Sequence, residues 1–402
     1  IVRQIEECLA NGEKLYICAD SRDGTFSTAG LTQKLQAQFP TLKILCVDAN
    51  TTSTLGHPAV GFVNSINEQI TSWDVVICSP SIGSGVSIDV KGHFDKVFGI
   101  FIGVIPDWEA RQALARVREP VERHVWCAKL GVGFVNKSIR STNYKQIVSL
   151  LINNAKFNFI RAELTPPSQN VDDFLEGHFE PAHIKAWSKY AAEINASMWH
   201  YRQCMFEGLK EEGCVIEVKN DNELNRKLNE ICGELQELNN RECSDEDYWR
   251  ISELQSERQK IVDTLNREEG EDAIVRRELK NTSSERKERK YKNVSKVPLP
   301  TEEEYEELTS KILKTEAEKC QEQKYILDQM YASAVPITPE LVKKTEEKKY
   351  HTRIQLDFFR THNPEFSKLY DRKQVSHQIE CGEQIYLPDL KNITLQVDTL
   401  KA

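Results

Sequence analysis

The sequence predicts an α/β protein in which a parallel sheet flanked by helices precedes a mainly α-helical region with an antiparallel coiled-coil hairpin. Two observations predict this fold class. Through residues 1–140, short apolar runs rich in β-branched residues alternate with helical segments, as in a parallel sheet covered on both faces. Beyond them, apolar residues recur at helical spacing, and in residues 224–265 they step by four and three.

The first 140 residues are expected to form one α/β domain. Helices are expected near residues 31–39 and 59–70, and a third begins at Pro106 and Asp107. In open α/β sheets, ligands bind at the carboxyl ends of the strands. The expected strands are residues 15–19, 43–49, 74–78, 96–103 and 124–130.

Three further segments are expected to follow this domain. Residues 141–218 are expected to form a helical accessory domain. Its aromatic side chains recur at helical spacing, and they either fill a core or stack on bases. Residues 219–335 contain the helical hairpin and a charged linker, and residues 336–402 a C-terminal helical segment. Because the chain starts at Ile1 and stops abruptly at Ala402, we expect it to be a piece of a longer protein.

Residues 276–296 are strongly basic, with nine lysines and arginines against three glutamates. Such a charge run is either a solvated face or linker, or a contact for the DNA backbone. The residues that would make possible DNA-backbone contacts are Arg276, Arg277, Arg286 and Lys287.

Composition limits the kinds of function. The 402 residues carry a net charge of -9, which gives no global attraction to nucleic acid, so any DNA contact must come from local basic patches. The 11 cysteines include no C-x-x-C pair, and no histidine combines with them at a metal-ligand spacing, which predicts reduced thiols and no metal site. Without a secretory signal or a long apolar run, we expect a cytoplasmic protein with no membrane partner.

A loop rich in serine and glycine follows the strand expected at residues 74–78. Glycines let a backbone approach a ligand closely, and serine hydroxyls can bind phosphate oxygens. The candidate residues for binding nucleotide or DNA are Ser79, Ser81, Gly83, Ser84, Gly85 and Ser87.

The helix that begins at Pro106 carries the candidate catalytic residues. Its register is expected to place Gln112, Arg116 and Glu119 on one face, with Arg118 turned aside. Arginine suits a site that faces a transferring phosphoryl group, because it stays charged and grips oxygens in a planar fork.

Together these segments resemble the second RecA-like lobe of superfamily 2 helicases. Ser79 and Gly85 keep the interval of the family's motif V, and Gln112 and Arg116 keep the Gln-x-x-x-Arg of motif VI, while residues 14–23 resemble motif IV. Two departures mark a divergent branch. Ser87 stands where many members have Asp, and Arg118 comes one residue early. The resemblance implies a nucleotide-facing role for Arg116 and, less directly, for Arg118 and Gln112.

A second resemblance covers most of the chain. Residues 48–88, 112–119 and 187–216 are similar to CyRepA-type plasmid replication proteins of cyanobacteria, whose helicase part is similar to herpesvirus origin-binding proteins. The resemblance implies a replication-initiation helicase that couples ATP hydrolysis to translocation on DNA or its unwinding. Its implied partners are single-stranded or origin-duplex DNA and other replication proteins.

The chain itself offers no convincing phosphate-binding loop. Residues 131–138 mimic a P-loop, but Asn136 replaces the glycine that lets the backbone wrap the phosphates. We therefore expect ATP and Mg²⁺ to be bound mainly by a first lobe outside these residues. Two alternatives stay open: a non-catalytic DNA- or protein-binding scaffold with a degenerate lobe, and an NTPase built on residues 131–138.

Overall fold

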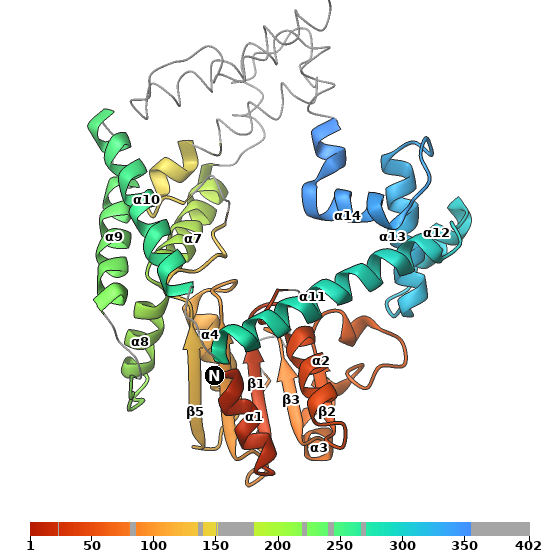
Figure 1. Cartoon of the computed structure of the whole chain (residues 1–402), viewed down its shortest axis with the longest axis horizontal. Coiled ribbons are helices and arrows are strands. Elements are labelled where there is room, and N and C mark those ends of the chain that lie inside the picture. The colour runs from red at the N-terminus through yellow and green to blue at the C-terminus, as the bar shows by residue number, and fades with distance from the viewer. Residues whose placement is uncertain are drawn as a thin grey trace, which may run out of the picture. The chain divides into compact units, whose positions relative to one another are not determined.

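A computed structural model describes residues 1–22, 24–80, 86–135, 140–149, 151, 181–218, 223–239, 245–266 and 271–354. The chain divides into two compact units (Figure 1). The first contains residues 1–132, 201–216 and 268–351, and the second contains residues 133–200, 217–267 and 352–402. The domain boundaries expected from the sequence remain predictions.

A five-stranded, all-parallel sheet forms the centre of the first unit, which confirms the predicted α/β class. Its spatial order is β2-β3-β1-β4-β5, so that β1 lies in the middle. The central strands are almost wholly buried, because helices cover both faces. The strands are β1 (Leu15–Ala19), β2 (Ile44–Val47), β3 (Val75–Cys78), β4 (Lys96–Phe101) and β5 (Glu122–Cys127).

One face of the sheet packs against three helices that are far apart in the sequence. Helices α1 (Val2–Ala10) and α2 (Thr28–Gln38) bury Ile5 and Leu31 against alternate residues of the strands. The long helix α11 (Glu271–Lys296) adds Leu279 to the same apolar cluster. The apolar core beside the sheet therefore includes a helix from the region beyond residue 270.

Helix α4 (Asp107–Leu114) covers the opposite face. Gly99 of β4 makes this approach possible, since a Cβ there would lie 2.8 Å from the Leu114 side chain. Helix α8 (Tyr201–Glu211) packs on α4 and β5. The helix expected near residues 59–70 is instead broken into η2 (Phe62–Ser65), α3 (Ile66–Gln69) and η3 (Ile70–Ser72), which follow the short turn η1 (Thr51–Ser53).

The basic segment, which was expected to include a linker, is the continuous helix α11. Its carboxyl-terminal half packs on α13 (Glu316–Met330) and α14 (Pro339–Lys348), beside α12 (Glu302–Ser310) (Figure 1). Tyr291 and Val294 of α11 lie in this second apolar cluster. Helix α11 thus spans two separate cores of the first unit.

The second unit contains α7 (Pro181–Trp199), α9 (Glu223–Asn239) and α10 (Asp245–Asn266). Helices α9 and α10 pack together, which confirms the predicted hairpin, and Arg250 pairs with Glu234 at 2.6 Å. Among the aromatic residues of α7, Trp199 is buried whereas Trp187 and Tyr190 are exposed. No described helix is both long and apolar enough to cross a bilayer.

Candidate functional site

The parallel strands end at one edge of the sheet, and two carboxylates at that edge are already occupied by the fold. Asp20 follows β1 and accepts the backbone N–H groups of Ile102 at 2.8 Å and Val104 at 2.7 Å. Asp48 follows β2 and accepts the N–H groups of Asn50 and Thr51, each at 2.9 Å. These carboxylates position loops, and they are poor candidates for binding a cation.

The two segments that carry the sequence pattern are hydrogen-bonded to each other. An isolated parallel bridge joins Ile88 to Val117. The N–H of Ile88 donates to the carbonyl of Arg116 at 2.8 Å, and the N–H of Arg118 donates to the carbonyl of Ile88 at 3.1 Å. Both bridging side chains are buried. The segment around Ile88 and the turn after α4 are therefore joined to each other.

Arg116 does not lie on the predicted helix face. Helix α4 ends at Leu114, so the expectation that Gln112, Arg116 and Glu119 share one helical face is wrong. The helix stops there because the chain turns to pair with Ile88 instead of continuing the helical bonds.

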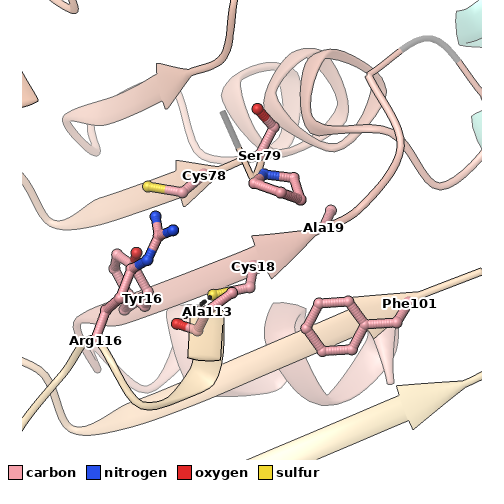
Figure 2. Close-up of a pocket in the computed structure, with 9 residues that line it drawn as sticks. Tyr16, Cys18, Ala19, Cys78, Ser79, Phe101, Ala113 and Arg116 are labelled. Carbon is pink, nitrogen blue, oxygen red and sulfur yellow. Dashed lines mark hydrogen bonds between the residues drawn. The ribbon is translucent and has the colours of Figure 1, made fainter. Parts of the chain in front are cut away.

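The Arg116 side chain points into a small pocket under the turn (Figure 2). It is only 7% exposed, and it lies with Tyr16 and Cys18 of β1 and with Cys78 and Ser79 at the end of β3. Alternation along β1 and β3 directs these side chains to the α4 face of the sheet. The pocket thus links the candidate arginine to Ser79 at the carboxyl end of a strand.

The groups around Arg116 stay neutral near pH 7. Burial raises the pKa of the Cys18 thiol to about 12, and it raises the pKa values of Tyr16 and Cys78 well above their usual values. Protonated thiols are poor nucleophiles. The pocket therefore brings a guanidinium beside the hydroxyls of Tyr16 and Ser79, and its described lining residues supply no thiolate for a covalent reaction.

Two further arginines support this region, and the sequence pattern did not reveal their roles. Arg123 of β5 donates to the carbonyls of Val117 at 2.7 Å and Val121 at 2.8 Å, and also to those of Leu114 and Glu119. It therefore caps α4 and holds the turn that carries Arg116. The sequence shows four arginines between residues 111 and 123, but their spacing does not distinguish an arginine that holds the turn from one that faces a ligand.

Arg111 of α4 links two helices. It pairs with Asp107 of its own helix at 3.2 Å and with Glu212 just after α8. Gly208 of α8 lies directly against its guanidinium, where a Cβ would lie 2.2 Å from the nearest atom. Arg111 is thus a packing residue between α4 and α8.

The other predicted site residues are dispersed. Gln112 and Arg118 are exposed, and neither lines the pocket around Arg116. Ser87 donates to Asp89 at 2.9 Å within a turn that Asn67 holds. Four predicted residues lie outside the described part of the chain: Ser81, Gly83, Ser84 and Gly85. The end of the P-loop mimic, residues 136–138, also lies outside it.

The predicted DNA contacts lie along α11. Arg276, Arg277 and Lys287 are exposed, whereas Arg286 is half-buried. Within the described ranges, no group of three acidic, histidine or cysteine side chains is placed to hold a metal ion.

Comparison with known proteins gives relatives of uncharacterized function. The chain is similar to an uncharacterized protein of the cyanobacterium Picosynechococcus sp., with 27% identity over 407 residues, covering 98% of this chain and 34% of that protein. The chain therefore spans about a third of that relative's length. Uncharacterized protein ORF115 of Ostreid herpesvirus 1 is 33% identical over 79 residues, which cover 18% of this chain and 31% of that protein. No family model and no solved structure matches the chain.

Proposed function

We propose that the chain is the C-terminal part of a CyRepA-type plasmid replication-initiation helicase, which couples ATP hydrolysis in the cytoplasm to translocation on DNA or its unwinding. The bridge between Ile88 and Val117 carries the proposal. It joins the loop after β3 to the turn that holds Arg116, beside the sheet edge where α/β proteins bind ligands. The proposal is supported by the organisms of the two relatives, a cyanobacterium and a herpesvirus, because the proposed family is cyanobacterial and its helicase part is similar to herpesvirus proteins.

In this proposal, Arg116 stabilises the charge that develops on the γ-phosphate during hydrolysis. Its side chain points inward in this structure, so the proposed role requires the side chain to turn toward the nucleotide. Arg118 and Gln112 are the secondary candidates on the exposed side of the same turn, and Ser79 faces nucleotide or the DNA backbone.

The described residues fit one side of a nucleotide site. They supply a guanidinium, while Asp20 and Asp48 already accept backbone N–H groups and are not available as magnesium ligands. ATP and Mg²⁺ would therefore be held mainly by a preceding lobe, with the metal neutralising phosphate charge.

The test compares the 402-residue chain with the same chain extended by the sequence that precedes it. We expect the 402 residues alone to hydrolyse no ATP and the extended protein to do so. In the extended protein, Arg116→Lys should lower the ATPase kcat by about 10³-fold or more, because lysine keeps the charge but loses the planar fork.

Arg3→Lys is the matched control, since Arg3 is exposed on α1 and lies outside the proposed site. It should retain most of the activity, and thermal unfolding should show both variants folded. ATP turnover by the 402 residues alone would contradict the split site, and full activity of Arg116→Lys would remove its assigned role.

A non-catalytic replication scaffold is the second candidate. The burial of Arg116 against Tyr16 and Cys78 favours it, because a lobe that had lost its motor would keep this arginine as a core residue. In that case Arg116→Lys would lower the stability and leave the binding of DNA or partner proteins intact.

A further inference from the structure

Helix α11 presents exposed basic residues on the side that faces away from its buried residues. Its buried residues Leu279, Ser283, Tyr291 and Val294 lie on one side of the helix. At 100° per residue, the opposite side carries four exposed basic residues, which we call the basic face of α11. These residues are Arg277, Arg289, Lys292 and Lys296.

Three glutamates between Arg277 and Lys296 also lie on this face, and two of them are paired with lysines of other helices. Glu278 pairs with Lys34 of α2 at 2.6 Å, and Glu288 pairs with Lys343 of α14 at 2.5 Å. Glu285 is the remaining glutamate that the helical register places on the basic face, and it is exposed. The face therefore keeps a positive balance in a protein whose net charge is -9.

Both ends of α11 are anchored, so the basic face has a fixed geometry. Leu279 is buried in the cluster beside the sheet, and Tyr291 is buried in the cluster with α13 and α14. At 1.5 Å per residue, Arg277 and Lys296 lie about 28 Å apart along the helix. A rigid row of cations suits a partner whose negative charges also have fixed spacing.

We infer that the basic face of α11 binds the phosphate backbone of duplex DNA independently of sequence. This inference deepens the proposed function, on which it rests, by naming the DNA form and the surface that holds it. A single strand fits less well, because strand-binding sites stack bases on aromatic rings, and Tyr291, the aromatic residue of this helix, is 1% exposed.

Other partners also fit less well. Among the described residues of α11, Ile274 at its amino-terminal end is the exposed large apolar side chain. Protein interfaces concentrate their binding energy in aromatic and apolar anchors, and membrane-surface helices insert an apolar face. A face of lysine, arginine and small polar residues matches phosphate contacts instead.

The test measures binding of the 402-residue chain to labelled duplexes of two unrelated sequences across a salt series. Replacing Arg277→Gln and Lys292→Gln together should weaken both duplexes several-fold and lower the slope of log K against log salt by about 2. The control double variant Lys43→Gln and Lys91→Gln removes two exposed charges outside α11. It should bind like the parent protein.

Glu285→Gln should change affinity in the opposite direction and tighten binding, which a merely structural role would not produce. Equal losses in the control, no loss in the α11 variant, tighter binding to a single strand of the same length, or binding to phosphatidylserine vesicles in place of duplex would each overturn the inference. ATP turnover is not a readout here, so failure of the motor proposal is detected separately.

Discussion

Four arginines lie between residues 111 and 123, and each has different surroundings. Arg111 joins α4 to α8, Arg123 binds four carbonyls, Arg118 is exposed, and Arg116 is buried beside Ser79. Equal charge therefore does not mean equal function. Of the four, Arg116 is the one that lies beside Ser79 at the end of β3, where the proposed nucleotide site would be.

Arg123→Ala should destabilise the first unit by about 2–3 kcal/mol, because the carbonyls of Leu114 and Val117 would lose a charged donor. Arg118→Ala should cost less than about 0.5 kcal/mol, since its side chain is exposed. Urea unfolding followed by far-UV circular dichroism measures both values. Equal losses in the two variants would show that Arg123 does not hold the turn.

At the scale of elements, close backbone approaches decide how the strands and loops meet. Gly103 follows β4 and has a φ of +75°. On either side of it, the backbone N–H groups of Ile102 and Val104 donate to the Asp20 carboxylate. The Gly103 carbonyl accepts the N–H of Val132 at 2.8 Å. The loops after β4 and β5 therefore pack backbone to backbone.

Gly103→Ala should be costly, because an added Cβ would lie 2.3 Å from the Cα of Gly131. Gly12 is the matched control: its φ is +82°, and nothing lies within 4 Å of an added Cβ. Gly12→Ala should cost about 1–2 kcal/mol from the left-handed backbone alone, and Gly103→Ala about 3 kcal/mol or more. Similar unfolding free energies for the two variants would contradict the close approach.

At the scale of the first unit, the helices α12–α14 are attached to the sheet domain in two ways. Helix α11 connects the two apolar clusters, and Lys319 of α13 binds the loop after β2. The Lys319 ammonium donates to the Asn50 carbonyl at 2.8 Å, the Ser53 hydroxyl at 3.0 Å and the Thr54 hydroxyl at 2.7 Å. This second attachment is entirely polar.

Lys319→Ala should loosen this attachment without unfolding the sheet. We expect amide hydrogen exchange to accelerate several-fold in residues 50–55 and 311–319, since the backbone bridge from Thr54 to Lys314 lies beside the lost ammonium. Exchange in β1 and β3 should not change. Lys348→Ala removes an exposed lysine at the end of α14 and serves as the control. Unchanged exchange in the loop would show that the Lys319 side chain does not hold this attachment.

Local patterns predicted the elements well. The buried strands were predicted from apolar, β-branched runs, and the start of α14 from Thr338 followed by Pro339, a cap that the structure confirms. The break in the helix expected near residues 59–70 was missed, because helical turns of different types share similar apolar spacing.

The sequence by itself determined the α/β class and the helical hairpin, because period-two and helical patterns reflect which side chains of a local segment share a face. Only the tertiary structure decided that α4 ends before Arg116, that this side chain points inward, and that α11 presents one basic face. Those outcomes depend on Ile88 and Leu279 meeting partners distant in sequence, which no local pattern encodes.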